Sequence, residues 1–309
     1  MGRKHNVAQT FLSAHNETAQ TFLPAHNETA QTRMSAYNAT AQTRMSAPHY
    51  ARLERLRAWF RNYPSALIAF SGGTDSAFLA AVAFDVLGKK ALAVTADSPS
   101  LPRRELAEAR SLARHIGIRH RVMRSTEFSE AAFTANPPDR CYHCKRNRFA
   151  LLAAFARKQG IAVVADGSNA DDLRDDRPGD RAVKELGIAQ PLQAFGFTKR
   201  EIRSLSRKMG LPTADKPAAA CLVSRLPYRI PIDKEILARV ERSEEALRRF
   251  GFTQFRVRLH GSVARIEIPP RDFPRLLRRR NAIAKALVAA GNPHIALDLL
   301  GYRMGSMNL

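Results

Sequence analysis

The hexapeptide S-G-G-T-D-S at residues 71–76 constrains the fold of this chain more than any other segment. It lies between two apolar runs, at 66–70 and 77–82. This order is typical of a buried strand, a tight glycine turn and the start of a helix. Two glycines let the backbone approach an anion, and the free amides at a helix start carry the positive end of its dipole. The segment therefore predicts a pyrophosphate site, although an ordinary strand-turn-helix connection also fits these six residues.

The hexapeptide resembles the PP-loop of the ATP pyrophosphatases, which cleave ATP between its α and β phosphates and adenylate a substrate. It lacks the G-K-[ST] ending of a Walker A loop. The resemblance implies that ATP binds at this turn. The residues that it assigns to ATP are Ser71, Gly72, Gly73, Asp75 and Ser76.

Predicted strands and helices alternate through the middle of the chain. This spacing predicts an α/β fold with a doubly wound parallel sheet, helices on both faces, and ligands at the carboxyl ends of the strands. The expected strands are 66–70, 90–95, 119–123 and 161–165, and the expected helices are 50–62, 75–87, 102–116, 142–158 and 198–209.

The pattern changes after residue 227, where a small α+β domain is expected over 228–309. The preceding residues 49–227 are then the PP-loop domain. The elements expected in the small domain are a helix at 233–250, strands at 253–259 and 262–268 with a hairpin turn at His260-Gly261, a helix at 271–290 and a strand at 294–299.

Residues 1–48 form a tail with an internal repeat of about eleven residues, which is too short for a solenoid. The repeat begins at Ala8 and returns at Ala19 and, with changes, at Ala30. Its units are polar and poor in aliphatic residues, so we expect disorder and no part in catalysis. A true start of translation near Met34 or Met45 would also explain the tail.

The chain is strongly basic, with a formal net charge of +22 over 309 residues. This balance suits anionic partners such as nucleotides, polyphosphates or nucleic acid, and a GC-rich genome produces the same arginine excess. No apolar run approaches the roughly 20 residues of a membrane span. The first residues also lack the apolar core of a signal peptide. A cytoplasmic protein without a membrane partner is therefore expected.

Two further polar turns follow predicted strands. Asp97 and Ser98 come after the second strand and are expected to hold adenine or ribose, unless this stretch only connects a strand to a helix. Asp171 lies in an acidic loop after the fourth strand. Carboxylates beside a bound triphosphate suit Mg²⁺, which makes Asp75 and Asp171 candidate Mg²⁺ ligands. The alternative is a solvated acidic loop.

The three cysteines argue against a disulfide framework and for metal or redox chemistry. Cys141 and Cys144 form a C-x-x-C, which by itself fits half a zinc site, a redox pair or chance, with His143 as a further candidate zinc ligand. Cys221 lies far along the chain. If the three thiols converge, they leave one metal position open, as in a [4Fe–4S] cluster with one free iron.

The basic segments near the C-terminus fall into two kinds. Arg256 and Arg258 alternate on an expected strand and share one face, which suits a phosphate clamp oriented by Glu244 or Glu245. The arginines of 271–280 have helical spacing, and we expect them to form a solvated helix face.

Together these segments resemble the LarE family of ATP-dependent sulfur transferases. The resemblance covers about residues 50–309 and rests on the PP-loop, the cysteine pair in 140–145, the 220–225 segment, the 256–258 strand and G-Y-R-M-G-S-M-N at 301–308. It implies that ATP and Mg²⁺ adenylate a carboxylate of pyridinium-3,5-biscarboxylic acid mononucleotide. Sulfur then forms the thiocarboxylate of the nickel-pincer nucleotide, which serves lactate racemase and its relatives.

The LarE family has two sulfur donors. Some members sacrifice a single cysteine that matches Cys221, leaving dehydroalanine, and others hold a [4Fe–4S] cluster with three cysteines. Because this chain has all three, the resemblance implies the cluster type. It also implies a homo-oligomer, a hexamer in family members. The implied site for the substrate phosphate consists of Ser224, Arg225, Arg256 and Arg258, with Glu244.

Other classes fit part of the pattern. A tRNA thiolase also has a PP-loop and uses cysteines or a cluster, but the chain has no obvious RNA-binding module, so nucleic acid is not an expected partner. An amide-forming ligase of the NAD synthetase kind would not need the three cysteines. A nucleotide-binding module without enzymatic activity would bind ATP without releasing pyrophosphate.

Overall fold

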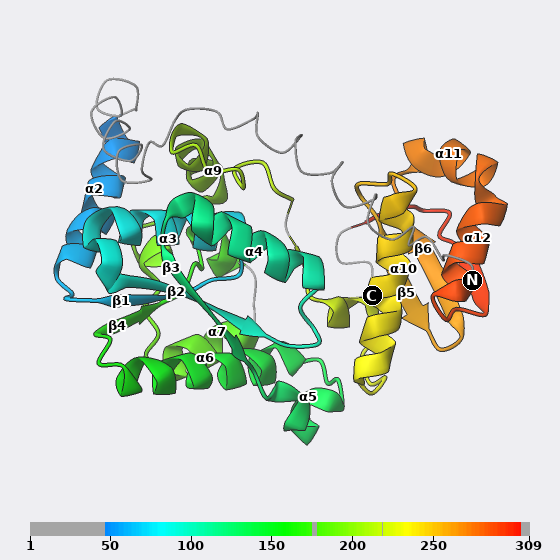
Figure 1. The fold of residues 1–309 in the computed structure, drawn as a ribbon, viewed down its shortest axis with the longest axis horizontal. Coiled ribbons are helices and arrows are strands. Elements are labelled where there is room, and N and C mark those ends of the chain that lie inside the picture. The colour runs from blue at the N-terminus through cyan, green and yellow to red at the C-terminus, as the bar shows by residue number, and fades with distance from the viewer. Residues whose placement is uncertain (1–46, 175–177, 218, 304–309) are drawn as a thin grey trace, which may run out of the picture.

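The computed structural model describes residues 47–174, 178–217 and 219–303 (Figure 1). Residues 1–46 of the expected tail and 304–308 of the C-terminal motif lie outside the described residues. Figure 1 shows two units side by side, each built around its own sheet.

The first sheet has four parallel strands in the order β3-β2-β1-β4. Helices cover both faces, with α3 and α4 on one side and α6 and α7 on the other (Figure 1). The predicted α/β fold class is therefore confirmed. The strands are β1 Ala66–Ala69, β2 Ala91–Asp97, β3 Arg119–Arg124 and β4 Val163–Ala165, and the helices are α2 Ala47–Arg61, α3 Thr74–Leu87, α4 Arg103–Ile116, α5 Ala131–Thr134, α6 Arg140–Lys158, α7 Pro178–Glu185, α8 Pro191–Ala194 and α9 Lys199–Lys208.

Alternation along the central strands builds two cores, one on each face of this sheet. Ile68 and Ala93 point into the core formed with α2, α3, α4 and α9. Their neighbours Leu67 and Val94 point into the core formed with α6 and α7. Strands buried on both faces in this way read as continuous apolar runs, which is why β1 is visible in the sequence.

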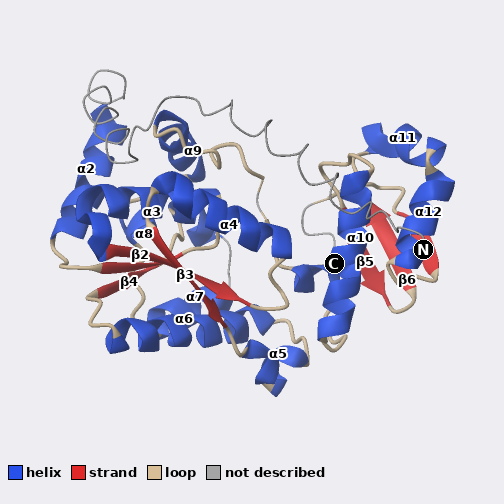
Figure 2. Ribbon diagram, viewed as in Figure 1, coloured by secondary structure: helices blue, strands red, loops and turns tan. Residues whose placement is uncertain are grey.

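The second sheet has the order β5-β6-β7, with β5 and β6 antiparallel and β6 and β7 parallel. Val257, Ile266 and Leu247 lie in its core. The helices α10, α11 and α12 pack around this sheet. Figure 2 draws them in blue and the strands in red. The elements are α10 Lys234–Arg249, β5 Arg256–His260, β6 Val263–Glu267, α11 Phe273–Arg278, α12 Arg280–Ala289 and β7 His294–Leu297.

Several details of the predicted elements differ from the structure. The strand expected over 253–259 begins only at Arg256. The hairpin turn lies one residue later than expected, because His260 pairs with Val263 and leaves 261–262 as the turn. The helix expected over 271–290 is interrupted at Arg279, whose φ of −107° leaves the helical range. Two short helices, α7 and α8, occupy a stretch in which no helix was predicted.

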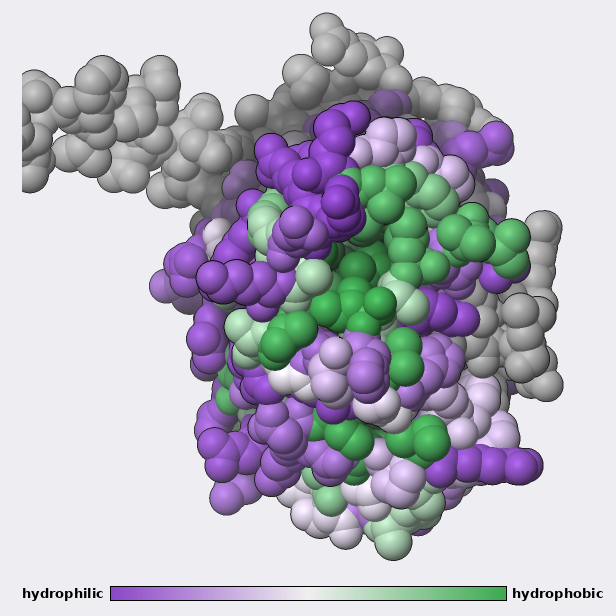
Figure 3. All heavy atoms as spheres, turned by 90° about the vertical axis from the view of Figure 1, so that its right-hand side faces the viewer, coloured by the Kyte–Doolittle hydropathy of each residue, from purple (hydrophilic) through white to green (hydrophobic). Residues whose placement is uncertain are grey.

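Apolar side chains gather around a hollow on the outer face of the second unit (Figure 3). Among the described residues, Leu277 of α11 and Val288 of α12 are more than half exposed, at 51% and 53%. None of the helices in the described ranges combines the length and hydropathy that a bilayer crossing requires.

The turn between β1 and α3 packs tightly against two other segments. Gly72 has a φ of +72°, and a Cβ there would lie 2.9 Å from the Cβ of Ala109 on α4. Gly167 follows β4, and a Cβ there would lie 2.9 Å from the backbone nitrogen of Ser76. Glycine is therefore required at both positions, where the turn after β1 packs against α4 and against the segment that follows β4.

Substitution of Gly72 by alanine should destabilise the fold by about 1–3 kcal/mol, because it combines a left-handed backbone with contact against α4. Gly73→Ala is the matched control, since its φ is −80° and a Cβ would meet only Ser71 Oγ, at 3.3 Å. Urea unfolding of the two variants and the wild type measures the difference. Equal losses of stability for both would contradict this account of the turn.

Candidate active site

A cleft of about 2190 Å³ runs from the PP-loop to the second unit. Small-molecule sites usually measure roughly 300–1,000 Å³, so this cleft has room for two ligands. Gly72 and Asn169 line its first end, while Glu244 and Arg256 line the other. The same cleft is therefore lined by Gly72, which is predicted to bind ATP, and by Arg225, Glu244 and Arg256, which are predicted to bind the substrate phosphate.

The PP-loop is held by its own hydroxyls. Ser71 Oγ and Ser76 Oγ lie 3.0 Å apart, and the backbone N–H of Gly73 donates to Ser71 Oγ at 3.3 Å. No side chain of the described residues caps α3 at Gly73. The first amides of α3 therefore remain available to an anion, which is the arrangement expected of a phosphate site.

Asp75 is the buried carboxylate of this end of the cleft. Its Oδ2 accepts hydrogen bonds from Asn169 Nδ2 and Lys199 Nζ, both at 3.2 Å. Its Oδ1 is buried without a hydrogen-bond partner among the described residues. Burial raises the pKa of Asp75 above its usual value, against the opposing charge of Lys199. A cation at Oδ1 would satisfy this oxygen, so Asp75 fits an Mg²⁺ ligand.

The other predicted residues at this end already have protein partners. Asp171 Oδ2 accepts from the backbone N–H of Lys199 at 2.7 Å. Asp97 pairs with Arg103 at 2.7 Å. Ser98 is buried, and its hydroxyl contacts Ser100 Oγ at 2.8 Å. Asp97 and Ser98 are therefore held by neighbouring polar groups in this structure, and their contact with a nucleotide stays a prediction.

A short chain of contacts links the helix of the cysteine pair to the segment of Cys221. Cys141 and Cys144 lie on one face of the first turns of α6. Arg148, one turn after Cys144, donates to Ser100 Oγ at 2.8 Å. The carbonyl of Ser100 in turn accepts from the backbone N–H of Leu222, the residue after Cys221, at 2.9 Å.

The thiols interact through their charges. Burial raises the pKa of Cys144 to about 12, and the positive charge of Arg148 opposes this rise. Desolvation also raises the pKa of Cys141, with a further contribution from the charge of Cys221. Within the described ranges, no three His, Cys, Asp or Glu side chains gather closely enough to bind one metal ion. An iron–sulfur cluster binds each thiolate through a different iron, so its cysteines need not meet at a point.

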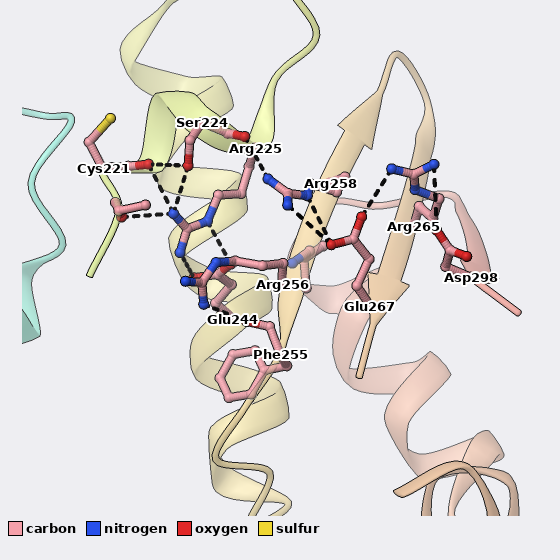
Figure 4. A network of polar contacts seen from close by, with 12 residues as sticks. Cys221, Ser224, Arg225, Glu244, Phe255, Arg256, Arg258, Arg265, Glu267 and Asp298 are labelled. Carbon is pink, nitrogen blue, oxygen red and sulfur yellow. Dashed lines mark hydrogen bonds and ion pairs between the residues drawn. The ribbon is translucent and has the colours of Figure 1, made fainter. Parts of the chain in front are cut away.

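The arginines of the second unit form a polar network at the other end of the cleft (Figure 4). Buried Arg225 makes a two-pronged contact with Glu244, with both N–O distances at 2.9 Å. Its Nη1 also donates to the carbonyl of Cys221 at 2.9 Å. Burial alone would lower the pKa of Arg225, but Glu244 raises it above the usual value. Arg225 therefore fixes the backbone beside Cys221.

Arg256 and Arg258 differ in their partners. Arg258 is paired with buried Glu267, 3.1 Å away, and donates to the carbonyl of Ser224 at 2.7 Å. Arg256 makes no ion pair with any described residue and lies over the ring of Tyr302, 5.4 Å from its centroid. Burial, and then the charge of Arg225, lower the pKa of Arg256. Arg256 is thus the arginine that most needs an anionic partner.

Several residues of the cleft were not predicted from the sequence. Lys199 contacts Asp75, and Lys216 contacts the PP-loop. Arg148 connects the cysteine helix to the segment of Cys221, and Glu267 neutralises Arg258. None of them belongs to a local motif, so only the folded chain reveals their partners.

The parallel sheet and its glycine turn define a PP-loop enzyme of the ATP pyrophosphatase class. The asparagine synthase family model matches residues 64–193, which include β1, the turn and α3. A tRNA-specific 2-thiouridylase of Azorhizobium caulinodans is 30% identical over 191 residues, which cover 49% of this chain and 48% of that enzyme.

Two relatives match nearly the whole globular chain. An uncharacterised protein of Synechocystis sp. is 44% identical over 84% of this chain and 97% of its own length. The pyridinium-3,5-bisthiocarboxylic acid mononucleotide synthase of Lactiplantibacillus plantarum is 34% identical over 82% of this chain and 92% of its own length. The chain therefore belongs to the LarE family of ATP-dependent sulfur transferases, as its motifs predicted.

Removal of the Glu244 carboxylate should be costly, because Arg225 would remain buried without its partner. We expect Glu244→Ala to destabilise the protein by about 3–5 kcal/mol. The adjacent Glu245→Ala is the control, since Glu245 is 42% exposed and pairs with Arg248 at the surface, where such pairs contribute at most about 1 kcal/mol. Urea unfolding measures both. If Glu244→Ala lowers the free energy of unfolding no more than Glu245→Ala does, the pair of Arg225 and Glu244 has no structural role.

The thiols of metal-free protein should react in a fixed order. Cys141 and Cys221 are exposed, whereas burial raises the pKa of Cys144 to about 12. Iodoacetamide at about pH 8 should therefore label Cys144 last, because the thiolate is the reacting form. Its labelling rate should rise steadily with pH. Peptide mass spectrometry over time measures the order, and early labelling of Cys144 would contradict its burial.

Proposed function

We propose that this enzyme adenylates a carboxylate of pyridinium-3,5-biscarboxylic acid mononucleotide and then inserts sulfur to form the thiocarboxylate. The single observation that carries the proposal is the shared cleft. Gly72 of the PP-loop lines one end of the cleft, and Arg225 and Arg256 line the other. The backbone carbonyl of Cys221 accepts a hydrogen bond from Arg225. Nucleotide, substrate phosphate and sulfur donor can therefore meet in one place.

The adenylation step follows from the first end of the cleft. The amides of α3 and the hydroxyls of Ser71 and Ser76 bind the phosphates of ATP. Mg²⁺ beside Asp75 would screen their charge. A carboxylate oxygen of the substrate attacks the α phosphorus, and the bond to the β-phosphate oxygen breaks, so that pyrophosphate leaves. Binding both reactants in one cleft supplies orientation, which accounts for much of the acceleration in such reactions.

The second end of the cleft positions the substrate. Arg256, which has no ion-pair partner among the described residues, offers its guanidinium to the phosphate of the mononucleotide, and Arg225 and Arg258 strengthen the positive field around it. A sulfur nucleophile then attacks the activated carbonyl carbon. The bond from this carbon to the adenylate oxygen breaks, AMP leaves, and the thiocarboxylate remains.

The sulfur donor is proposed to depend on all three cysteines. Their contacts through Arg148 and Ser100 fit a [4Fe–4S] cluster at the edge of the cleft. When bound, such a cluster supplies a sulfide from its iron that lacks a protein ligand. We place the reaction in the cytoplasm, where thiols remain reduced. The exposed apolar side chains on the outer face of the second unit (Figure 3) support assembly into a homo-oligomer. A hexamer is the form proposed from the family resemblance.

A tRNA thiolase is the second candidate, because the thiouridylase relative shares the PP-loop region. That match covers only 49% of this chain, whereas the mononucleotide synthase matches 82%. Pyrophosphate release measured with the pyridinium mononucleotide and with tRNA as alternative acceptors separates the two. Release that depends on tRNA alone would favour the second candidate.

Cysteine variants test the sulfur donor. We expect Cys221→Ala to retain pyrophosphate release and to lose thiocarboxylate formation, because adenylation needs no thiol. Cys141→Ala with Cys144→Ala should lose sulfur transfer in the same way if the cluster is the donor. Mass spectrometry of product and protein after a single turnover measures both. Dehydroalanine at position 221, with sulfur transfer intact in the double variant, would instead show that Cys221 is sacrificed.

A further inference from the structure

The contacts of Lys216 join the PP-loop to acidic side chains of α4. Its Nζ lies 3.3 Å from the carbonyl oxygen of Gly72, 2.6 Å from Glu105 Oε2 and 2.9 Å from Glu108 Oε2. An ammonium has three donors, and these three acceptors match them. The side chain is only 16% exposed and lines the cleft. A cation is therefore held against the turn where a triphosphate would bind.

The backbone around Lys216 is fixed to the same turn. Thr74, the first residue of α3, donates its hydroxyl to the carbonyl of Thr213 at 2.7 Å. Arg203 donates to the carbonyls of Ala214 and Lys216, at 3.2 and 2.9 Å. The position of the Lys216 backbone is thus set by α3 and α9, and the long side chain is the part that can change its partners.

The charges around Lys216 suit an exchange of partners. Two carboxylates contact the Lys216 ammonium and one of them also pairs with Arg104, so the two cations and two carboxylates of this group balance in the absence of a ligand. Each carboxylate keeps a favourable setting without Lys216. Glu108 also accepts from Arg104 at 2.6 Å, and Glu105 lies in the first turn of α4, near the positive end of the helix dipole. The ammonium can therefore leave them without stranding either charge.

We propose that Lys216 binds the triphosphate of ATP, and that Glu105 and Glu108 hold it beside the PP-loop until ATP arrives. On binding, the ammonium exchanges the two carboxylates for phosphate oxygens and remains against the turn. Lys199 differs, because it contacts Asp75, the candidate Mg²⁺ ligand. The inference rests on the proposed use of ATP by this site and adds a cation that no local motif indicates.

The test is a set of five proteins: wild type, Lys216→Met, Lys216→Arg, the pair Glu105→Gln with Glu108→Gln, and the triple variant. Direct binding of Mg-ATP by calorimetry and the KM for Mg-ATP in pyrophosphate release are measured for each. Lys216→Met should weaken ATP binding by at least about tenfold, the scale of a charge-assisted contact. Lys216→Arg, which keeps the charge, should restore part of the affinity.

The glutamine pair separates a phosphate ligand from a structural lysine. If Lys216 binds phosphate, removal of its two competitors should strengthen ATP binding in the wild-type background more than in the Lys216→Met background. An equal effect in both backgrounds, or unchanged ATP binding by Lys216→Met, would overturn the inference. The triple variant leaves no unbalanced carboxylates, so its comparison with the glutamine pair tests the lysine even if Lys216→Met alone folds poorly, and urea unfolding checks folding in all five.

Failure of the inference and failure of the proposed function give different results. A wild-type protein that binds no Mg-ATP contradicts the proposed function itself. A wild-type protein that binds Mg-ATP, together with a folded triple variant that binds it as tightly as the glutamine pair does, contradicts only the role of Lys216.

Discussion

Close backbone packing around the PP-loop is the constraint on which the rest of the site depends. A Cβ at Gly72 would meet α4, and one at Gly167 would meet the start of α3. The turn is therefore clamped between the segments that follow β2 and β4. Because parallel strands end at the same edge of the sheet, this clamp places Asp75 and Lys216 beside the turn as well. A phosphate site formed in this way is rigid before any ligand binds.

Charge is arranged differently at the two ends of the cleft. At the PP-loop end, Lys199 and Lys216 are matched by carboxylates, so the anion site is electrostatically balanced in the free protein. At the other end, Arg225 and Arg258 have buried carboxylate partners, while Arg256 has none among the described residues. The position of Arg256 therefore says more about where an anionic substrate would bind than the formal charge of +22 does.

Local patterns predicted the elements, and distant contacts completed the site. The strand, turn and helix at the PP-loop were predictable because glycines and apolar runs act on neighbouring residues. The roles of Lys199 and Lys216 were not, since their partners lie 124 and 144 residues away in the sequence. The interruption at Arg279 also lacks a proline or glycine to mark it. The link between the cysteine helix and the segment of Cys221 likewise depends on Ser100, which belongs to no motif.

The central claim is that Cys141, Cys144 and Cys221 hold the sulfur donor together at the edge of a cleft that binds ATP. The most direct test is the iron and acid-labile sulfide content of protein isolated without oxygen, compared with a Cys221→Ala variant. The account predicts a [4Fe–4S] complement in the wild type and its loss in the variant. A colourless wild-type protein with three intact thiols, which still transfers sulfur, would contradict it.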